Sequence, residues 1–94
     1  MANINGTTSV DKGNVSEDPD ILLSQIGLRI VRRRQELGLT QKALANAVDT
    51  QATNLSRIEG GTQNVTIRTL CKIAEALDTT VAELVGGAPA PRSR

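Results

Sequence analysis

The sequence predicts an all-α domain of five helices between two irregular terminal segments. Apolar residues recur at helical spacing in five consecutive segments, and no segment alternates apolar and polar residues as a strand would. The ends differ in composition, with Asn, Gly, Ser and Thr abundant at the start and "GGAPAPRSR" closing the chain. We therefore expect a disordered acidic arm over residues 1–19, one domain over 20–86 and a flexible tail over 87–94.

The first two predicted helices cover residues 20–37 and 41–48. In the first, four apolar residues fall on one face: Leu23, Ile26, Ile30 and Leu37. Gly38 follows where a helix C-terminus favours glycine. In the second, Leu44 and Val48 lie four residues apart and share a face.

The third predicted helix, about residues 51–59, has only two clearly apolar residues at helical spacing, Leu55 and Ile58. The segment that joins it to the second helix is about three residues long. So short a link forces the two helices to cross sharply, which is the helix-turn-helix arrangement.

The fourth and fifth predicted helices cover residues 67–77 and 81–85. The apolar stripe of the fourth comprises Ile67, Leu70, Ile73, Ala74 and Leu77. Cys71 lies beside this stripe, and we expect it to be a half-buried structural thiol. The hydroxyl residues that precede helices two, four and five are the predicted N-caps: Thr40, Thr66 and Thr80.

Composition excludes several functional classes. The 94-residue chain has no His, one Cys and no aromatic residue. One Cys cannot form an intrachain disulfide or a Cys-based zinc site, and no nucleophile, base or metal-ligand set is clustered. We expect no enzyme activity, no metal and no cofactor. The missing aromatics also count against modules that stack single-stranded bases. No membrane span or secretory signal is evident, so we expect a cytoplasmic protein.

The net charge of +1 is unevenly distributed. Residues 1–20 carry one Lys against four acidic residues, whereas residues 21–87 carry eight basic and six acidic residues. The domain is therefore mildly basic, which fits a nucleic-acid partner but is weak evidence alone.

Two stretches, "LTQKALANAVDTQATNLSRIEGG" and "TIRTLCKIAEALDTTVAEL", resemble the Xre-type helix-turn-helix family, which includes phage repressors and Cro proteins. The resemblance covers roughly residues 26–85. It implies a compact, lambda-repressor-like five-helix DNA-binding domain whose third helix enters the major groove. The segment "GGTQNVTIRTLCKIAEAL" is also similar to small restriction–modification controller proteins.

The resemblance implies that the start of the third helix touches base edges. The candidate base contacts are Gln51, Ala52, Thr53, Ser56 and Arg57. Ala52 could meet a thymine methyl group, and Arg57 could make a bidentate contact to guanine or reach a phosphate. The alternative for this outward face is solvated surface, and Gln51 could simply lie at the helix start.

Two departures from the family pattern affect this register. Asp49 stands where many relatives place a turn glycine, and Asp tolerates the left-handed backbone better than most residues. Gln51 stands where many relatives have a Ser N-cap. If Thr50 or Asp49 caps instead, the helix start and the base contacts shift by one residue.

The same resemblance gives candidate phosphate contacts at the second helix and in the loop "GGTQNVT": Gln41, Lys42, Thr62 and Asn64. Backbone amides at the start of the fourth helix could also receive a phosphate. The alternatives are an ordinary first-turn polar residue for Gln41, which could also brace the third helix, and a solvated charge for Lys42.

We expect the three consecutive arginines at 32–34 to have different structural roles. By family position, Arg34 pairs with Glu59 as a largely buried structural ion pair. Arg32 and Arg33 are expected to be solvated or to contact phosphates at a distance.

A specific operator usually needs two half-sites bound by a dimer. The candidate dimer interface comprises Leu77, Val81, Leu84 and Val85. The alternative is that these residues complete the monomer core, which is favoured for Leu77. The sequence thus predicts a homodimeric transcriptional regulator that binds double-stranded DNA at a palindromic operator, with no membrane partner or small-molecule effector evident. The alternative is an antitoxin or another protein-interaction module, which the acidic residues 1–20 favour.

Overall fold

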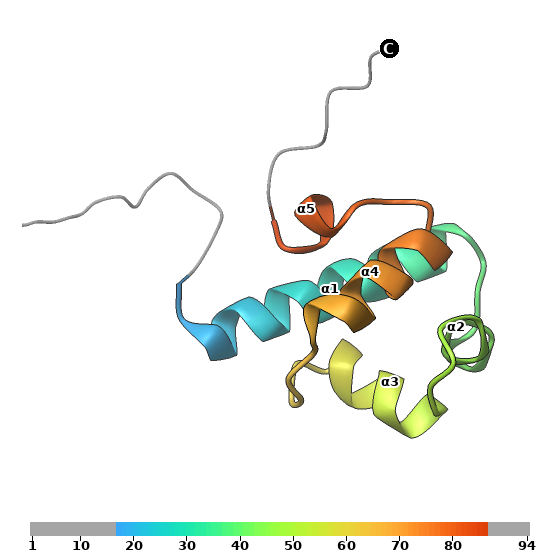
Figure 1. Cartoon of the computed structure of the whole chain (residues 1–94), viewed down its shortest axis with the longest axis horizontal. Helices are drawn as coiled ribbons and strands as arrows, with labels where there is room; N and C mark the ends of the chain where they lie inside the picture. The colour runs from blue at the N-terminus through green and yellow to red at the C-terminus, as the bar shows by residue number, and fades with distance from the viewer. Residues whose placement is uncertain (1–16, 87–94) are drawn as a thin grey trace, which may run out of the picture.

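The computed structural model of the chain describes residues 17–86 and contains five helices (Figure 1). These are α1 (Pro19–Glu36), α2 (Gln41–Ala47), α3 (Ala52–Glu59), α4 (Ile67–Ala76) and α5 (Val81–Leu84). Every predicted helix is present, and each predicted boundary lies within one residue of the observed one. The expected tail, residues 87–94, and residues 1–16 of the expected arm lie outside the described part of the chain. Residues 17–19 of that arm are described, and there Asp18 caps α1 and Pro19 begins it.

Side-chain caps begin four of the five helices. The hydroxyls of Thr40, Thr66 and Thr80 accept hydrogen bonds from backbone amides three residues later, as predicted. Asp18 caps α1, because its carboxylate accepts from the amide of Asp20 at 2.9 Å. Each cap satisfies an amide that has no partner inside the helix, which is typically worth about 1 kcal/mol.

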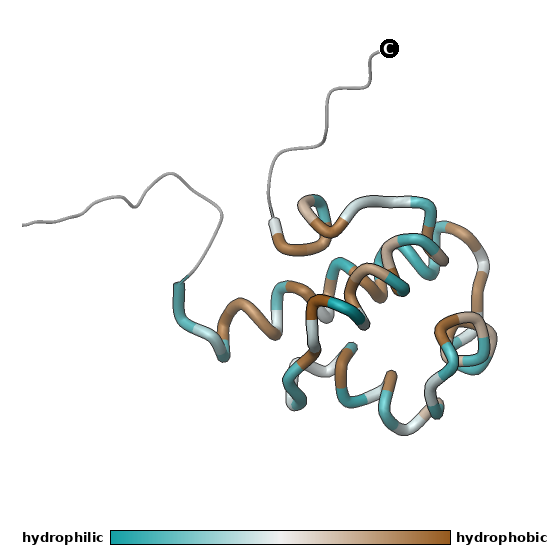
Figure 2. Tube along the Cα trace, viewed as in Figure 1, coloured by the Kyte–Doolittle hydropathy of each residue, from teal (hydrophilic) through white to brown (hydrophobic). Residues whose placement is uncertain are grey.

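Apolar residues from all five helices meet in one core. The largest fully buried side chains are Ile30, Leu44, Leu55, Ile73 and Leu77. Figure 2 shows hydrophobic residues in each of the five helices, interspersed with hydrophilic ones. No helix in residues 17–86 is long and apolar enough to cross a membrane.

Three expected inward positions are wrong. Leu37 is 41% exposed because α1 has already ended at Glu36, and Ile67 is 67% exposed at the first position of α4. Cys71, expected to be half-buried, is exposed. Apolar periodicity does not show where a stripe leaves the core at a helix end, nor whether a residue beside the stripe, such as Cys71 in the middle of α4, is covered.

The candidate dimer interface also needs a correction. Leu77 and Leu84 are 0% and 2% exposed within the monomer, so their side chains have no surface left for a partner. Val81 and Val85 are half-buried and pack against the edge of the core. The monomer therefore uses two of the four residues, because a small core needs every large apolar side chain that faces it.

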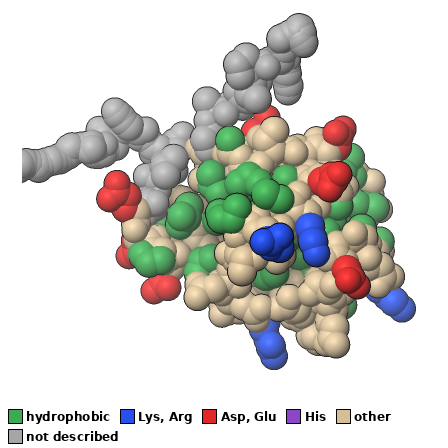
Figure 3. Space-filling view, viewed as in Figure 1, with side chains coloured by type: hydrophobic (Ala, Val, Ile, Leu, Met, Phe, Trp, Pro, Cys, Tyr) green, Lys and Arg blue, Asp and Glu red, His purple; other side chains and the backbone are tan. Residues whose placement is uncertain are grey.

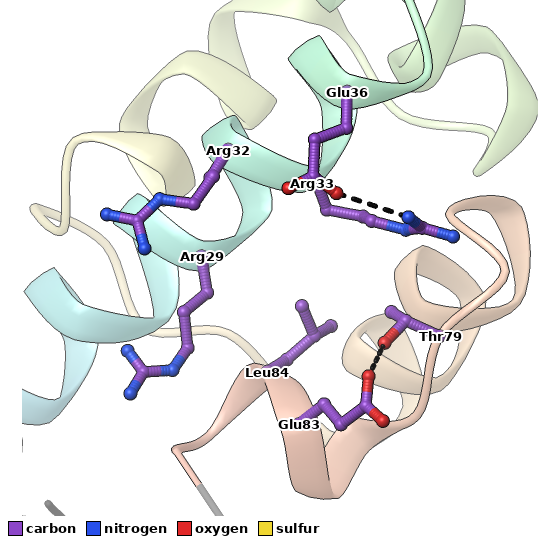
Figure 4. Close-up of a pocket in the computed structure, with 7 residues that line it drawn as sticks. All are labelled: Arg29, Arg32, Arg33, Glu36, Thr79, Glu83 and Leu84. Carbon is purple, nitrogen blue, oxygen red and sulfur yellow. Dashed lines mark hydrogen bonds and ion pairs between the residues drawn. The ribbon is translucent and has the colours of Figure 1, made fainter. Parts of the chain in front are cut away.

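Arg33, expected to be solvated or a distant phosphate contact, is 31% exposed and is bonded to the end of α4. Its Nε donates to the Leu77 carbonyl at 2.8 Å, and its Nη2 donates to the Asp78 carbonyl at 3.2 Å. It also forms an ion pair with Glu36 at 3.2 Å, drawn in Figure 4 with the cleft between α1 and α5. Arg33 thus supplies donors and positive charge to the C-terminal end of α4, where carbonyls lack partners in the helix.

Candidate DNA-binding interface

A tight turn joins α2 to α3. Asp49 has a φ of 59°, the left-handed conformation that the sequence suggested. Its amide donates to the Asn46 carbonyl at 3.2 Å, and the Thr50 amide donates to the Ala45 carbonyl at 2.9 Å. An L-residue in this conformation costs roughly 1 kcal/mol, and Asp is among the residues that tolerate it. The turn therefore keeps the geometry that glycine would give.

Helix α3 begins at Ala52, and Gln51 is its N-cap residue without a side-chain hydrogen bond. Neither Asp49 nor Thr50 caps the helix, so the alternative start one residue away is wrong. The Thr50 hydroxyl instead accepts a hydrogen bond from Asn54 Nδ2 at 2.7 Å. The register used for the predicted outward face therefore holds.

The predicted outward face of α3 is exposed along its whole length. Every candidate base contact on it is solvent-accessible: Gln51, Ala52, Thr53, Ser56 and Arg57. On the other side, Leu55 and Ile58 are 0% and 3% exposed and hold the helix against the core. The structure thus presents polar and small side chains together on one anchored helix.

An ion pair ties α3 to α1, as predicted. Arg34 Nε lies 2.7 Å from Glu59 Oε2, and Arg34 Nη2 donates to Glu59 Oε1 at 3.1 Å. The side chains of Arg34 and Glu59 are 13% and 4% exposed. Two parallel hydrogen bonds between guanidinium and carboxylate fix both orientation and distance.

Gln41 and Leu39 complete this buried network. Gln41 Nε2 donates to Glu59 Oε1 at 2.8 Å, and Arg34 Nη1 donates to the Leu39 carbonyl at 2.8 Å. Gln41, at the start of α2, therefore braces the end of α3, one of the roles considered from the sequence. The network joins α1, α2 and α3 at one point, which sets the angle between the two helices of the motif.

The other candidate phosphate contacts lie near the ends of α2 and α3. Lys42, Thr62 and Asn64 are all exposed. The Thr62 hydroxyl donates to the Arg57 carbonyl at 3.3 Å, and its amide donates to the same oxygen at 3.0 Å. Thr62 therefore also closes the C-terminal end of α3.

Sequence reasoning missed two polar side chains that position α3. Asn54 donates to Thr50 in the turn, and its Oδ1 accepts a hydrogen bond from Gln63 Nε2 in the loop after α3. The four-residue spacing between Thr50 and Asn54 was a signal for the first contact. No local pattern indicates the second, because Gln63 meets Asn54 only after the chain has turned.

Sequence reasoning also missed the close approach of α1 to α3. Gly27 is buried, and a Cβ placed on it would lie 2.3 Å from the Glu59 carbonyl oxygen. Only glycine allows the two backbones to come so near. Gly61, with a φ of +75°, likewise lies against Ser24, where a Cβ would be 2.8 Å from the Ser24 Cα.

Residues 30–84, which include the whole α2–turn–α3 unit, match the family model HTH_3, described as helix-turn-helix. The chain belongs to this helix-turn-helix family. The Xre-type resemblance and the lambda-repressor-like five-helix fold are thereby confirmed. This HTH_3 chain is a DNA-binding transcriptional regulator and not an enzyme.

Solved structures of regulators are similar to this HTH_3 chain. The restriction–modification controller protein C.AhdI from Aeromonas hydrophila is 32% identical, with a TM-score of 0.64 over 66% of this chain and 94% of that one. The clp gene regulator ClgR from Corynebacterium glutamicum is 28% identical, with a TM-score of 0.66 over 68% of each chain. SinR, a master regulator for biofilm formation crystallised with DNA, is 36% identical, with a TM-score of 0.61 over 64% and 97%. A search of curated proteins gave no match.

Proposed function

We propose that the domain, residues 20–86, binds a palindromic DNA operator as a homodimer and inserts α3 into the major groove. The observation that supports this proposal is the exposed outward face of α3 on a helix held by buried contacts on its other side. A side chain reads a base only if its helix is fixed relative to the DNA backbone. The buried network around Glu59 supplies that rigidity here.

Each side chain on this face has a different chemical role. Arg57, with its five donors, suits the O6 and N7 acceptors of guanine. Thr53 offers a hydroxyl and a methyl group, and Ala52 offers a methyl contact to thymine. Gln51, at the start of the face, and Ser56, beside Arg57, can exchange hydrogen bonds with base edges.

Phosphate contacts on both sides of α3 would orient the domain. Gln41 still has an oxygen and one amide hydrogen beyond its bond to Glu59, and Lys42 is exposed beside it. Across α3, Thr62 and Asn64 are exposed in the loop before α4. These groups would bracket the groove and fix the register without reading sequence.

The proposed dimer uses the exposed edge of α5. Val81 and Val85 keep part of their surface accessible, whereas Leu77 and Leu84 stay in the core beneath them. In Figure 1, α5 and α3 lie on opposite sides of α1 and α4. A dimer would present two copies of α3 to half-sites about 34 Å apart.

Selection of binding sites from random double-stranded DNA tests the proposal. The selected sequences should converge on an inverted repeat whose half-sites are about 10 base pairs apart, centre to centre. A footprinting experiment on the DNA upstream of the chain's own gene then tests whether an operator lies there. Selection without any sequence convergence would contradict a sequence-specific regulator.

Arg57→Ala should weaken binding to the selected operator by about 1–3 kcal/mol, because it removes a bidentate base contact. Binding to random DNA should change much less. Titrations of both DNAs by fluorescence anisotropy at one fixed salt concentration measure the two effects. Lys72→Ala is the control, since Lys72 is also an exposed cation but lies in the middle of α4, away from the helix start considered for phosphate contact. An equal loss on operator and random DNA would make Arg57 a phosphate contact.

A further inference from the structure

The loop between α3 and α4, residues 60–66, carries two candidate phosphate contacts and has little apolar packing of its own. Val65 is its only apolar residue, and it packs against the edge of the core. Within residues 17–86, the backbone amides of residues 63–66 donate no hydrogen bond to a backbone carbonyl. Figure 3 shows mostly uncharged polar side chains and backbone on the lower part of the molecule, where α3 lies in Figure 1. The position of this loop therefore depends largely on polar side-chain contacts.

Asn54 supplies such a contact from the flank of α3. It is half-buried, between the outward face and the buried side, and it lies beside Arg57, which follows it by three residues. Its Oδ1 accepts a hydrogen bond from Gln63 Nε2, and its Nδ2 donates to the Thr50 hydroxyl at 2.7 Å. The three side chains thus form a chain of hydrogen bonds that runs from the α2–α3 turn, along the flank of α3, to the loop that follows it.

Gln63 stands between the two candidate phosphate contacts of the loop, Thr62 and Asn64. Thr62 is itself tied to α3, because its amide donates to the Arg57 carbonyl at 3.0 Å. Residues 62 and 63 therefore hold the loop to α3 at two points, the carbonyl of Arg57 and the side chain of Asn54. These two points set the distance between a phosphate bound by the loop and a base that α3 meets.

We propose that Asn54 and Gln63 are positioning residues that determine sequence specificity, an inference that rests on the proposed insertion of α3 into the major groove. Their hydrogen bond keeps the phosphate contacts of the loop in register with the base contacts on α3. Phosphate contacts fix the register of a protein on DNA, and base contacts supply the sequence information, so discrimination needs both at once. Without this bond, the loop can still hold a phosphate while the side chains of α3 lie out of register with the operator bases. Operator binding then falls, and binding to random DNA is retained.

A double-mutant cycle on specificity tests this inference. Gln63→Ala and Asn54→Ala each remove the hydrogen bond between loop and helix. For each variant and for the double variant, fluorescence anisotropy at one fixed salt concentration gives the ratio of the Kd for random DNA to the Kd for the selected operator. Each single variant should lower this ratio about tenfold, the size of one lost base contact. The double variant should also lower it only about tenfold, because the second substitution removes no further tie between loop and helix. Gln35→Ala, an exposed glutamine on α1, is the control and should leave the ratio unchanged.

The ratio separates positioning from a role in stability, because an unfolded fraction weakens binding to both DNAs by the same factor. Three results would overturn the inference. An equal loss on both DNAs would mean phosphate contact or support of the fold, and a wild-type ratio in either single variant would mean that its side chain does not set the register. A roughly hundredfold fall in the double variant would mean two independent base contacts. All three leave the proposed function intact, whereas a wild-type protein that binds both DNAs equally would overturn the proposed function and this inference with it.

Discussion

Replacing Gly27 with Ala should lower the free energy of unfolding by about 3 kcal/mol, near the upper end of overpacking costs. The added Cβ would lie 2.3 Å from the Glu59 carbonyl oxygen and 2.8 Å from the Ile58 carbonyl oxygen. Both atoms belong to the backbone of α3, so no side-chain rotation relieves the clash. On an exposed helix the same change would stabilise by about 1 kcal/mol. Here α1 and α3 must separate, which disturbs the helix proposed to read DNA.

Urea denaturation followed by circular dichroism measures this effect. Gly60→Ala is the matched control, because Gly60 has a φ of −81° and its Cβ would come no closer than 3.3 Å to another atom. The control should change stability by less than about 1 kcal/mol. A Gly27→Ala variant as stable as this control would show that the two helices do not approach so closely in solution.

The helices and most of their caps could be predicted because their signals are local. A Thr before an apolar-periodic segment, or a turn residue that tolerates positive φ, acts within a few residues of itself. The buried side of α3 could also be predicted from the sequence, since Leu55 and Ile58 are its only clearly apolar residues at helical spacing. If Leu55 and Ile58 pack inward, the residues on the opposite face of α3 must point outward. The candidate base contacts could therefore be named from the sequence.

The surroundings of the three arginines at 32–34 could not be predicted from the residues near them in the sequence. Successive residues on a helix point about 100° apart, so three identical side chains meet three different surroundings. Arg32 reaches solvent, Arg33 reaches the end of α4, and Arg34 reaches Glu59. Only the family position of Arg34 distinguished one of them in advance. The two carbonyls at the end of α4 to which Arg33 donates are 44 and 45 residues away, and nothing near Arg33 in the sequence indicates them.

The same limit explains Gly27 and the α5 region. In the sequence, Gly27 is only a poor helix former. Glycine is needed there because the backbone of α3 approaches it closely, and the local sequence does not show that approach. Leu84 and Val85 are adjacent and both apolar, and only the docking of α5 decides which enters the core. Sequence alone therefore identified the apolar set without separating core from surface.

Removing one partner of the Arg34–Glu59 pair should destabilise the domain by about 3–5 kcal/mol, because it leaves the other charge largely buried without its counter-ion. Arg34→Met leaves the Glu59 carboxylate with one of its hydrogen bonds, the one from Gln41. Glu59→Leu strands the guanidinium with only the Leu39 carbonyl. Both variants keep approximately the volume of the side chain that they replace, so lost packing is a minor contribution.

The double variant Arg34→Met/Glu59→Leu distinguishes this explanation from a general intolerance of change. With both charges gone, no buried charge is left unpaired, and well-packed apolar replacements of buried ion pairs are often neutral or stabilising. The double variant should therefore be more stable than either single variant, which urea denaturation of all four proteins measures as a coupling free energy. Strictly additive losses would show that the two charges contribute independently. The double variant could also fold well yet bind the operator poorly. In that case the pair serves to orient α3 rather than to stabilise the fold, because apolar side chains fill the same space but make no directional hydrogen bonds.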